Sequence, residues 1–313
     1  MIKEVISAVD KAVKGSGLLY VGDKGIQLDA SKFVHLQEKS GNVVFIDGGQ
    51  CEIIGGANFS LQFIRVCAAG YANGKRVDQK VFEYYALIKT VDEQGIIFRT
   101  EVFGGTVSIP DIRADDNSLK TGARAVEINQ VTGVVRKVIE LDVMCGVAER
   151  LNEGILVRDG DLQCQCNAEQ QWWDRLKRSG IDVVGLCKTG HAISGGSSAN
   201  YSLLNQGPEQ PWYYRHTYNG IYTGFVKLHP SSKYVFRVDC FSEENLGCLI
   251  EHATDPIFYG YPYGLVVADK FGRVSNNEQE FLRVRFMHAC GALWKELELH
   301  SHSLDAHKIL DSI

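Results

Sequence analysis

The stretch "VVFIDGGQCEI", residues 43–53, runs four apolar residues straight into Asp47 and places two glycines directly after this acid. The apolar run predicts a buried strand over residues 43–47 that ends on the carboxylate. A simple turn after the strand would explain the glycines without any function. The alternative is that side chains are missing beside Asp47 because something else must lie there.

The same pattern returns in "ILVRDGDL", residues 155–162, where a second apolar strand ends on Asp159 and Gly160. One such Asp-Gly pair is typical of a turn, but two with matching apolar lead-ins favour a shared site. Residues 81–90 and 96–103 bracket "VDEQG" and are expected to form a hairpin. Three segments between the two Asp-Gly pairs are predicted strands: residues 60–72, 81–90 and 96–103.

A long helix is predicted within residues 126–154. Its apolar residues recur at the spacing of one helix face, at positions 134, 138, 141, 145 and 148. Gly154 is the expected C-terminal stop of this helix. Glu140 lies off the apolar stripe, on the predicted helix surface.

An aromatic helix over residues 168–180 and a strand over residues 182–190 follow the second Asp-Gly pair. Three antiparallel strands, a helix and then a parallel strand form the order of a ribonuclease-H-like core, which is an α/β architecture. Ligands of such sheets gather outside the carboxyl ends of the strands. We therefore expect an RNase H-like mixed sheet flanked by helices, with helical and hairpin additions at the carboxyl end.

Asp47 and Asp159 would meet if their strands were adjacent and parallel, since such strand ends lie roughly 5 Å apart. Two carboxylates held that close repel each other, and a divalent cation is the usual remedy. Oxygen-rich ligand sets suit Mg²⁺ or Mn²⁺. Glu140 is the candidate third ligand from the helix, with Asp142 and Glu149 as rivals. The glycines would then leave room for a metal and a phosphate backbone.

Composition narrows the possibilities further. The chain has 313 residues, of which 45% are apolar and 23% charged, and its net charge of −5 gives no global basic footprint for nucleic acid. No apolar run is long enough for a membrane span, and the first residues lack the core of a signal peptide. Nine scattered cysteines indicate reduced thiols, so we expect a cytoplasmic protein. Without a proline-rich linker, residues 1–313 are expected to form one domain.

The carboxyl-terminal third adds a predicted hairpin over residues 221–241 and an aromatic loop. Tyrosines in such a loop are usually packing residues, but beside a helix that bears an acid they can also stack on single-stranded bases. A helix with Asp269 and Lys270 follows, and another begins near Asn277. The aromatic residues of the loop are Phe258, Tyr259, Tyr261 and Tyr263.

Five segments in this order, "FIDGG", "ELDVMCGVAERL", "LVRDGDL", "VVGLCKT" and "GYPYGLVVADK", resemble the NurA family of DNA-repair nucleases. The resemblance covers about residues 40–290, and it is the collinear set rather than any one motif that is specific. It implies a metal-dependent deoxyribonuclease, exonuclease or endonuclease, that acts on single-stranded DNA and DNA ends. It also implies Mn²⁺ or Mg²⁺ as cofactor, a homodimer, and docking on a HerA-type hexameric ATPase in end resection and double-strand break repair.

We expect Asp269 to be a catalytic residue that binds the metal. Residue by residue, the resemblance implies the same of Asp47, Glu140 and Asp159, and it implies that Tyr261 is the catalytic tyrosine of the active site. It further implies that Lys188 contacts DNA phosphate and that Tyr261 positions the strand. The RNase H-like core would span about residues 40–200, and residues 201–313 would complete the site. The chain departs from the family pattern at three positions: Gly49 stands where serine is common, Asp269 where several members have histidine, and Asp161 where a small residue is usual.

Other interpretations remain open at this stage. Actin-like ATPases and sugar kinases share the core and also place an Asp and glycines after the first strand, but "DGGQCEI" lacks their usual Ser or Thr. A NurA-like adaptor that docks an ATPase without activity is a second alternative. Each candidate also has an ordinary role: Glu140 on a solvated helix face, Asp269 paired with Lys270, Tyr261 in the core, and Lys188 on the surface.

Overall fold

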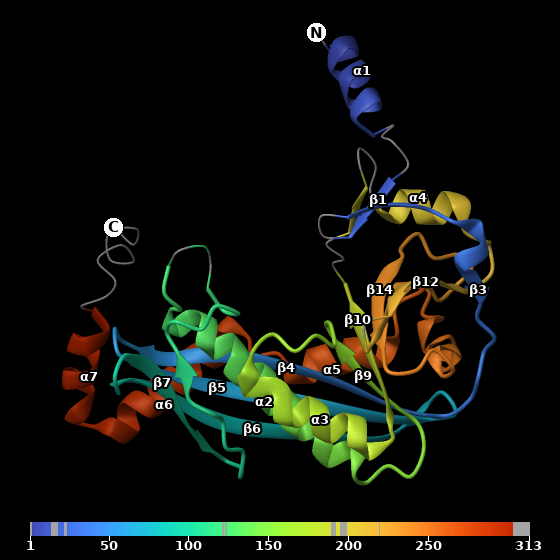
Figure 1. Ribbon diagram of the computed structural model, residues 1–313. Coiled ribbons are helices and arrows are strands. Elements are labelled where there is room, and N and C mark those ends of the chain that lie inside the picture. The colour runs from blue at the N-terminus through green and yellow to red at the C-terminus, as the bar shows by residue number, and fades with distance from the viewer. Residues whose placement is uncertain are drawn as a thin grey trace.

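The computed structural model describes residues 2–13, 18–21, 24–120, 122, 124–188, 192–194, 199–218 and 220–302. Within these residues the chain builds one large mixed sheet and one small sheet (Figure 1). The strands of the large sheet are β3 (Phe33–His35), β4 (Asn42–Gly55), β5 (Phe59–Ala72), β6 (Lys75–Asp92), β7 (Ile96–Phe103), β8 (Ile112–Arg113), β9 (Ile155–Asp159), β10 (Asp182–Cys187), β12 (Trp212–Tyr218), β13 (Tyr222–Lys227) and β14 (Phe236–Cys240). Those of the small sheet are β1 (Leu18–Val21), β2 (Lys24–Gln27) and β11 (Ala192–Ser194).

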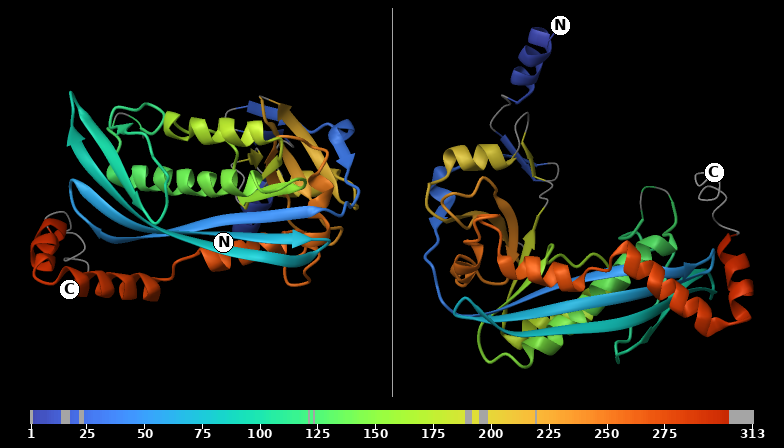
Figure 2. Two further views of the ribbon diagram at one scale, coloured as in Figure 1. Left: turned by 90° about the horizontal axis from the view of Figure 1, so that it is seen from below. Right: turned by 180° about the vertical axis from the view of Figure 1, so that it is seen from behind.

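The helices of the described residues are α1 (Ile2–Val13), α2 (Ile128–Ala148), α3 (Gln170–Ser179), α4 (Ala199–Gln206), α5 (Tyr263–Gly272), α6 (Asn276–Cys290) and α7 (Leu293–His302). Figure 2 shows α2 and α3 on one face of the sheet and α5 and α6 on the opposite face. None of these helices is both long and apolar enough to cross a membrane. All nine cysteines have unpaired thiols in the structure.

The centre of the large sheet has the predicted connectivity. β4, β5, β6 and β7 pair antiparallel in sequence, while β9 runs parallel to β4 on its other side and β10 runs parallel to β9. The mixed sheet is therefore RNase H-like, and the predicted fold class is confirmed. The carboxyl-terminal third joins the same sheet, because β14 pairs with β10 and the predicted hairpin partner β13 pairs with β14. β12, which pairs with β13, has no counterpart in the prediction.

β4 does not end at Asp47, so the predicted strand end is wrong. The strand continues to Gly55, and the residues after Asp47 stay paired with β5. The reason lies in the following residues, since Cys51, Ile53 and Ile54 are all buried in a cluster that includes Trp294 of α7. Asp47 thus lies inside a long strand rather than at its rim.

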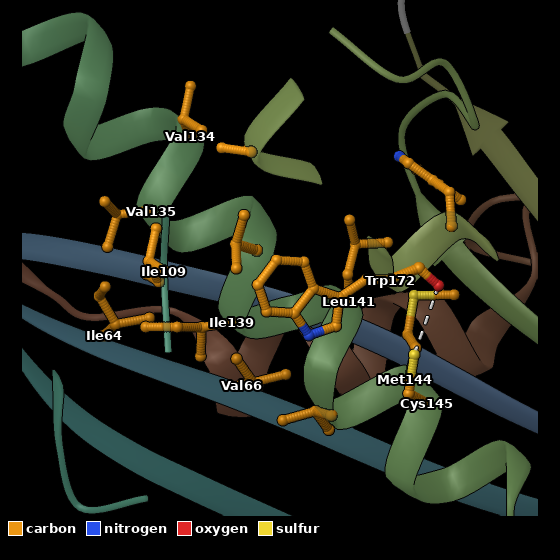
Figure 3. Packing of buried hydrophobic residues seen from close by; sticks show 14 of the residues in the cluster. Ile64, Val66, Ile109, Val134, Val135, Ile139, Leu141, Met144, Cys145 and Trp172 are labelled. Atoms are coloured by element: carbon orange, nitrogen blue, oxygen red, sulfur yellow. Dashed lines mark hydrogen bonds between the residues drawn. The ribbon is translucent and has the colours of Figure 1, made fainter. Parts of the chain in front are cut away.

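α2 covers one face of the sheet centre and is buried almost all round. Its predicted apolar stripe is buried as expected, and its side chains pack on Ile64 and Val66 of β5 (Figure 3). The thiol of Cys145 lies 3.6 Å from the carbonyl oxygen of Trp172, which ties α2 to α3 (Figure 3). The predicted end at Gly154 is wrong, because the helix closes at Ala148. Gly154 lies in the turn before β9, where its φ of +122° suits only glycine.

α5 covers the opposite face. Leu265 and Ala268 of this helix are fully buried against Phe45 of β4 and Val157 of β9. With α2 on one face and α5 on the other, the middle strands are shielded on both sides, which explains why they read as apolar runs. The polar residues of these strands are consequently the exceptions that need a reason.

Candidate active site

β4 and β9 bring the two Asp-Gly pairs together. Their parallel pairing runs in step from Val43 opposite Ile155 to Ile46 opposite Arg158. The next residue on each strand is an aspartate, Asp47 on β4 and Asp159 on β9. The predicted adjacency of the two strands is thus confirmed, and both carboxylates belong to one site.

Asp47 carries the most strongly perturbed carboxyl group of this site. Burial, followed by the negative charges of Asp159 and Glu140, raises the pKa of Asp47 from 3.8 to about 7. The backbone N–H of Gly48 donates to Asp47 Oδ1 at 2.8 Å, and the charge of Lys188 also lowers the pKa, but neither cancels the shift. Three acids therefore lie close enough to repel one another, which is the situation that a bound cation relieves.

Glu140 is the acid of α2 that faces Asp47. It is buried, only 3% exposed, so the expectation of a position on the helix surface is wrong. Its rivals point elsewhere: Asp142 accepts a hydrogen bond from Trp172 Nε1 at 3.2 Å, and Glu149 accepts one from Arg175. The sequence does not show which of the three acids faces Asp47. The packing of α2 between β4 and α3 decides it, because Glu140 faces the sheet and the other two face α3.

Two arginines that sequence reasoning missed hold Glu140. Arg136 Nη1 donates to Glu140 Oε1 at 2.6 Å and also to the carbonyl oxygen of Gly48 at 2.9 Å. Arg158 Nη2 donates to Glu140 Oε2 at 3.0 Å, and its Nη1 donates to the carbonyl oxygen of Asp161. A signal existed in "ILVRD", because a charged residue inside a fully apolar strand requires a buried partner.

The two glycines after Asp47 are explained by neighbours from distant parts of the chain. A Cβ on Gly48 would lie 2.6 Å from Glu140 Oε1, and a Cβ on Gly49 would lie 2.6 Å from the carbonyl oxygen of Gly272. Gly48 therefore admits the acid of α2 on one side, and Gly49 admits the end of α5 on the other. Gly160 differs from both, since its φ of +113° marks a real turn after β9.

Lys188 and Asp269 complete the charged group. Lys188 directly follows β10, and its Nζ lies 2.5 Å from Asp159 Oδ2 and 4.0 Å from Asp269 Oδ1. Burial works against the charge of Lys188, but the hydrogen bond to Asp159 and the charges of Asp159, Asp269 and Asp47 outweigh it and raise the pKa of Lys188. Asp269 therefore lies within ion-pair distance of Lys188, whereas the expected alternative had paired it with Lys270.

Tyr261 lies beneath this group. Its side chain is 5% exposed, and Lys188 Nζ stands 5.5 Å from the centre of its ring. Burial and then the charges of Asp159, Asp47 and Asp269 raise its pKa, so the phenol keeps its proton. Its hydroxyl has no hydrogen-bond partner among the described residues. A buried hydroxyl in that state is costly, and an oxygen of a bound ligand would satisfy it.

The site's fit to a metal ion rests on Asp47 and Asp159. Across the described ranges, no three His, Cys, Asp or Glu side chains converge on one metal position. Both oxygens of Glu140 are engaged by arginines, and Asp159 is engaged by Lys188. Asp47, in contrast, accepts from a backbone N–H and is repelled by its neighbours. A divalent cation would suit the two carboxylates, and Asp47 would gain most from its charge.

No protein-family model and no curated protein matches the sequence. The structure is similar to the NurA nuclease from Sulfolobus solfataricus, with a TM-score of 0.51 and 11% identity over 94% of this chain and 94% of that one. A second NurA structure gives a TM-score of 0.53 and 8% identity over 92% of this chain and 96% of that one. The chain therefore has the fold of the NurA nucleases along nearly its whole length.

Proposed function

We propose that the chain is a metal-dependent deoxyribonuclease that cleaves single-stranded DNA and DNA ends. The observation that carries the proposal is the carboxylate pair Asp47 and Asp159, with the pKa of Asp47 raised to about 7 by burial and by the two neighbouring acids. Carboxyl groups whose pKa is raised by burial and by neighbouring acids cluster at functional sites. The shared fold with NurA nucleases supports the same reaction class.

Asp47 and Asp159 would hold Mn²⁺ or Mg²⁺, with Glu140 and Asp269 as neighbouring acids of the same site. The bound ion would activate water and stabilise the leaving oxygen of the phosphodiester. Lys188, which pairs with Asp159 in the structure, would pair with a phosphate oxygen instead. The protonated hydroxyl of Tyr261 is a donor for the same backbone and would orient the strand.

The partners follow from the same proposal. We infer that the active form is a homodimer docked on a HerA-type hexameric ATPase, and that it resects DNA ends during double-strand break repair. The support is the fold that the chain shares with the NurA nucleases. Co-purification of the chain with a HerA-type ATPase, followed by its mass in light scattering, tests both partners.

An Asp47→Ala variant tests the chemistry. We expect wild-type protein to degrade labelled single-stranded DNA only when Mn²⁺ or Mg²⁺ is present, and Asp47→Ala to lose at least about a hundredfold in rate, since a metal ligand is removed. Asp92→Asn, an exposed acid at the end of β6, is the matched control and should cleave normally. Calorimetric titration with Mn²⁺ gives a readout that does not depend on turnover. Undiminished metal-dependent digestion by Asp47→Ala would overturn the assignment.

The arginine pairing of Glu140 is the one observation that favours a second function, an adaptor without nuclease activity. In that case wild-type protein would leave DNA intact with either metal while still binding the ATPase. The kinase alternative has less support. Gly48 and Gly49 lie within β4 and pair with Val66 and Arg65 of β5. They therefore do not form the loop that a phosphate would need.

A further inference from the structure

Two stacked ring pairs lie between two loops near the candidate active site. Tyr259 stacks on His229 with ring centres 4.3 Å apart and planes 11° apart, and Phe258 stacks on Tyr234 at 5.1 Å and 14°. One member of each pair comes from the turn between β13 and β14, and the other comes from the turn before α5. We call these four residues the aromatic platform.

The aromatic platform is open to solvent. Phe258 is 41% exposed, Tyr234 48% and Tyr259 36%, and the neighbouring Ile257 is 91% exposed. A contiguous set of exposed rings is unusual, because a lone exposed aromatic residue is ordinary but a patch marks a surface that binds something. The exposed parts of these rings are therefore accessible to a flat ligand.

The two loops that carry the rings are held in place. A Cβ on Gly260 would lie 2.3 Å from Ser232 Oγ, so glycine at this position lets the loops touch directly. The N–H of Gly260 donates to the carbonyl oxygen of Ala253 at 2.8 Å, and Ser232 Oγ donates to that of Tyr234 at 2.9 Å. The rings are thus fixed before any ligand arrives, which lowers the entropic cost of binding.

A short chain of contacts joins the aromatic platform to the acids. The ring of Phe258 meets that of Tyr261 edge to face at 5.9 Å, and Tyr261 lies under Lys188. Lys188 in turn contacts Asp159. A strand whose phosphate lies at Lys188 would therefore carry its neighbouring bases toward Phe258 and Tyr259.

We propose that the aromatic platform binds the bases of single-stranded DNA next to the phosphodiester at the acid site. The proposal rests on the proposed nuclease function. Flat, exposed ring faces suit bases of any sequence, and bases are accessible only when they are not paired in a duplex. The exposed Lys233 beside Tyr234 adds a cation for the backbone of the same strand.

The test measures binding without catalysis. Fluorescein-labelled oligodeoxythymidine is titrated with protein in EDTA, and anisotropy reports the Kd. We expect the double variant Phe258→Ala/Tyr259→Ala to bind at least about tenfold more weakly, since the loss of a single stacked base already costs about that factor. Phe281→Ala, a 65% exposed aromatic of α6, is the matched control and should bind like wild type. A Phe258→Tyr variant that keeps Tyr259 should bind more tightly than the double variant, because both positions then carry a ring.

An abasic oligonucleotide separates stacking from other effects. Wild type should bind it as weakly as the double variant binds the normal strand, and the double variant should lose nothing further. Equal affinity of wild type and double variant for the normal strand would overturn the proposal. So would a double variant that is weaker than wild type on the abasic strand by the same factor as on the normal strand. A change in oligomeric state with unchanged DNA binding would assign the surface to a protein partner instead.

The binding test and the cleavage test can fail separately, although the aromatic platform is inferred from the proposed nuclease function. If wild type leaves DNA intact but the double variant loses affinity, the aromatic platform stands and the nuclease function is refuted. If wild type cleaves DNA but the double variant keeps full affinity, the nuclease function stands and the aromatic platform is refuted. Equal melting temperatures of wild type and variants show that the loops remain folded in either case.

Discussion

The negative charge of Asp47 is unfavourable in the folded chain, because the carboxyl group is buried beside two other acids. Its carboxyl titrates near pH 7 in the folded chain against 3.8 as the ordinary value. Between these two pH values the folded state binds more protons than the unfolded state, so this group lowers stability as pH rises from about 4 to 7. Above pH 7 the full cost is present, and at pH values below about 4 it vanishes.

The Asp47→Asn variant should remove this dependence. Its free energy of unfolding minus that of wild type should be larger at pH 8 than at pH 5 by about 1–3 kcal/mol. The variant gains stability at high pH because asparagine carries no charge to bury. Urea denaturation at both pH values in EDTA measures the difference. Asp92→Asn should show no such gain, and an equal change of Asp47→Asn at both pH values would contradict the assigned pKa.

At the scale of residues, the sequence predicted which positions mattered but not always why. Gly48 and Gly49 were singled out correctly, yet their reasons are Glu140 and the backbone of Gly272, which lie 92 and 223 residues further along. Such contacts leave no local pattern. Asp159 could be assigned to a strand end because Gly160 makes a true turn, whereas Asp47 could not, since the sheet continues past it.

At the scale of elements, the contact of α5 with β4 decides whether Tyr261 and Asp269 reach the acids. Gly264 lies in the first turn of α5, and a Cβ there would lie 1.9 Å from Phe45 Cδ2. Phe45 cannot yield, because its ring is fully buried between Tyr71 and His252. The helix approaches the strand this closely only because its first turn has no side chain at that position.

A Gly264→Ala variant should therefore lift α5 from the sheet. We expect a loss of about 1–3 kcal/mol in the free energy of unfolding from overpacking, and a larger loss of cleavage than of stability because Asp269 and Tyr261 move with the helix. Guanidinium denaturation and the cleavage assay measure the two effects. Gly291→Ala, where a Cβ would meet nothing within 4 Å, is a control for packing, although its φ of +56° adds some strain of its own. Full activity of Gly264→Ala would show that α5 does not position the site.

Elements with a clear period or an apolar run were predictable, and others were not. β5, the β6–β7 hairpin and α2 follow local rules, so their positions agree with expectation apart from the ends. β12 was missed because Trp212, Tyr213 and Tyr214 are buried in succession, covered on both faces, and therefore show no alternation. The phase of Glu140 depended on which side of α2 meets β4, and no local pattern encodes that.

At the scale of the whole molecule, one sheet draws strands from the beginning, middle and end of the sequence. β14 pairs with β10, and α5 covers β4, so the core predicted over residues 40–200 is not closed without the remainder. Residues 1–200 expressed alone should aggregate or lack a cooperative unfolding transition, because Phe45, Val157 and Val184 lose their cover. Co-expression with residues 201–313 should restore the fold. A cooperative transition of residues 1–200 alone would instead make the carboxyl-terminal third a separate domain.

The order of the acids along the chain also has a consequence for biosynthesis. Asp47 is synthesised before Asp159, and Asp159 before Asp269, and Gly49 receives the end of α5 only after residue 272 has been added. While the chain is still on the ribosome, β4 and β9 lack α5, the helix that covers them. Under the proposed function, the nascent polypeptide cannot cleave nucleic acid before residue 272 has been synthesised, since the active site needs α5 against β4.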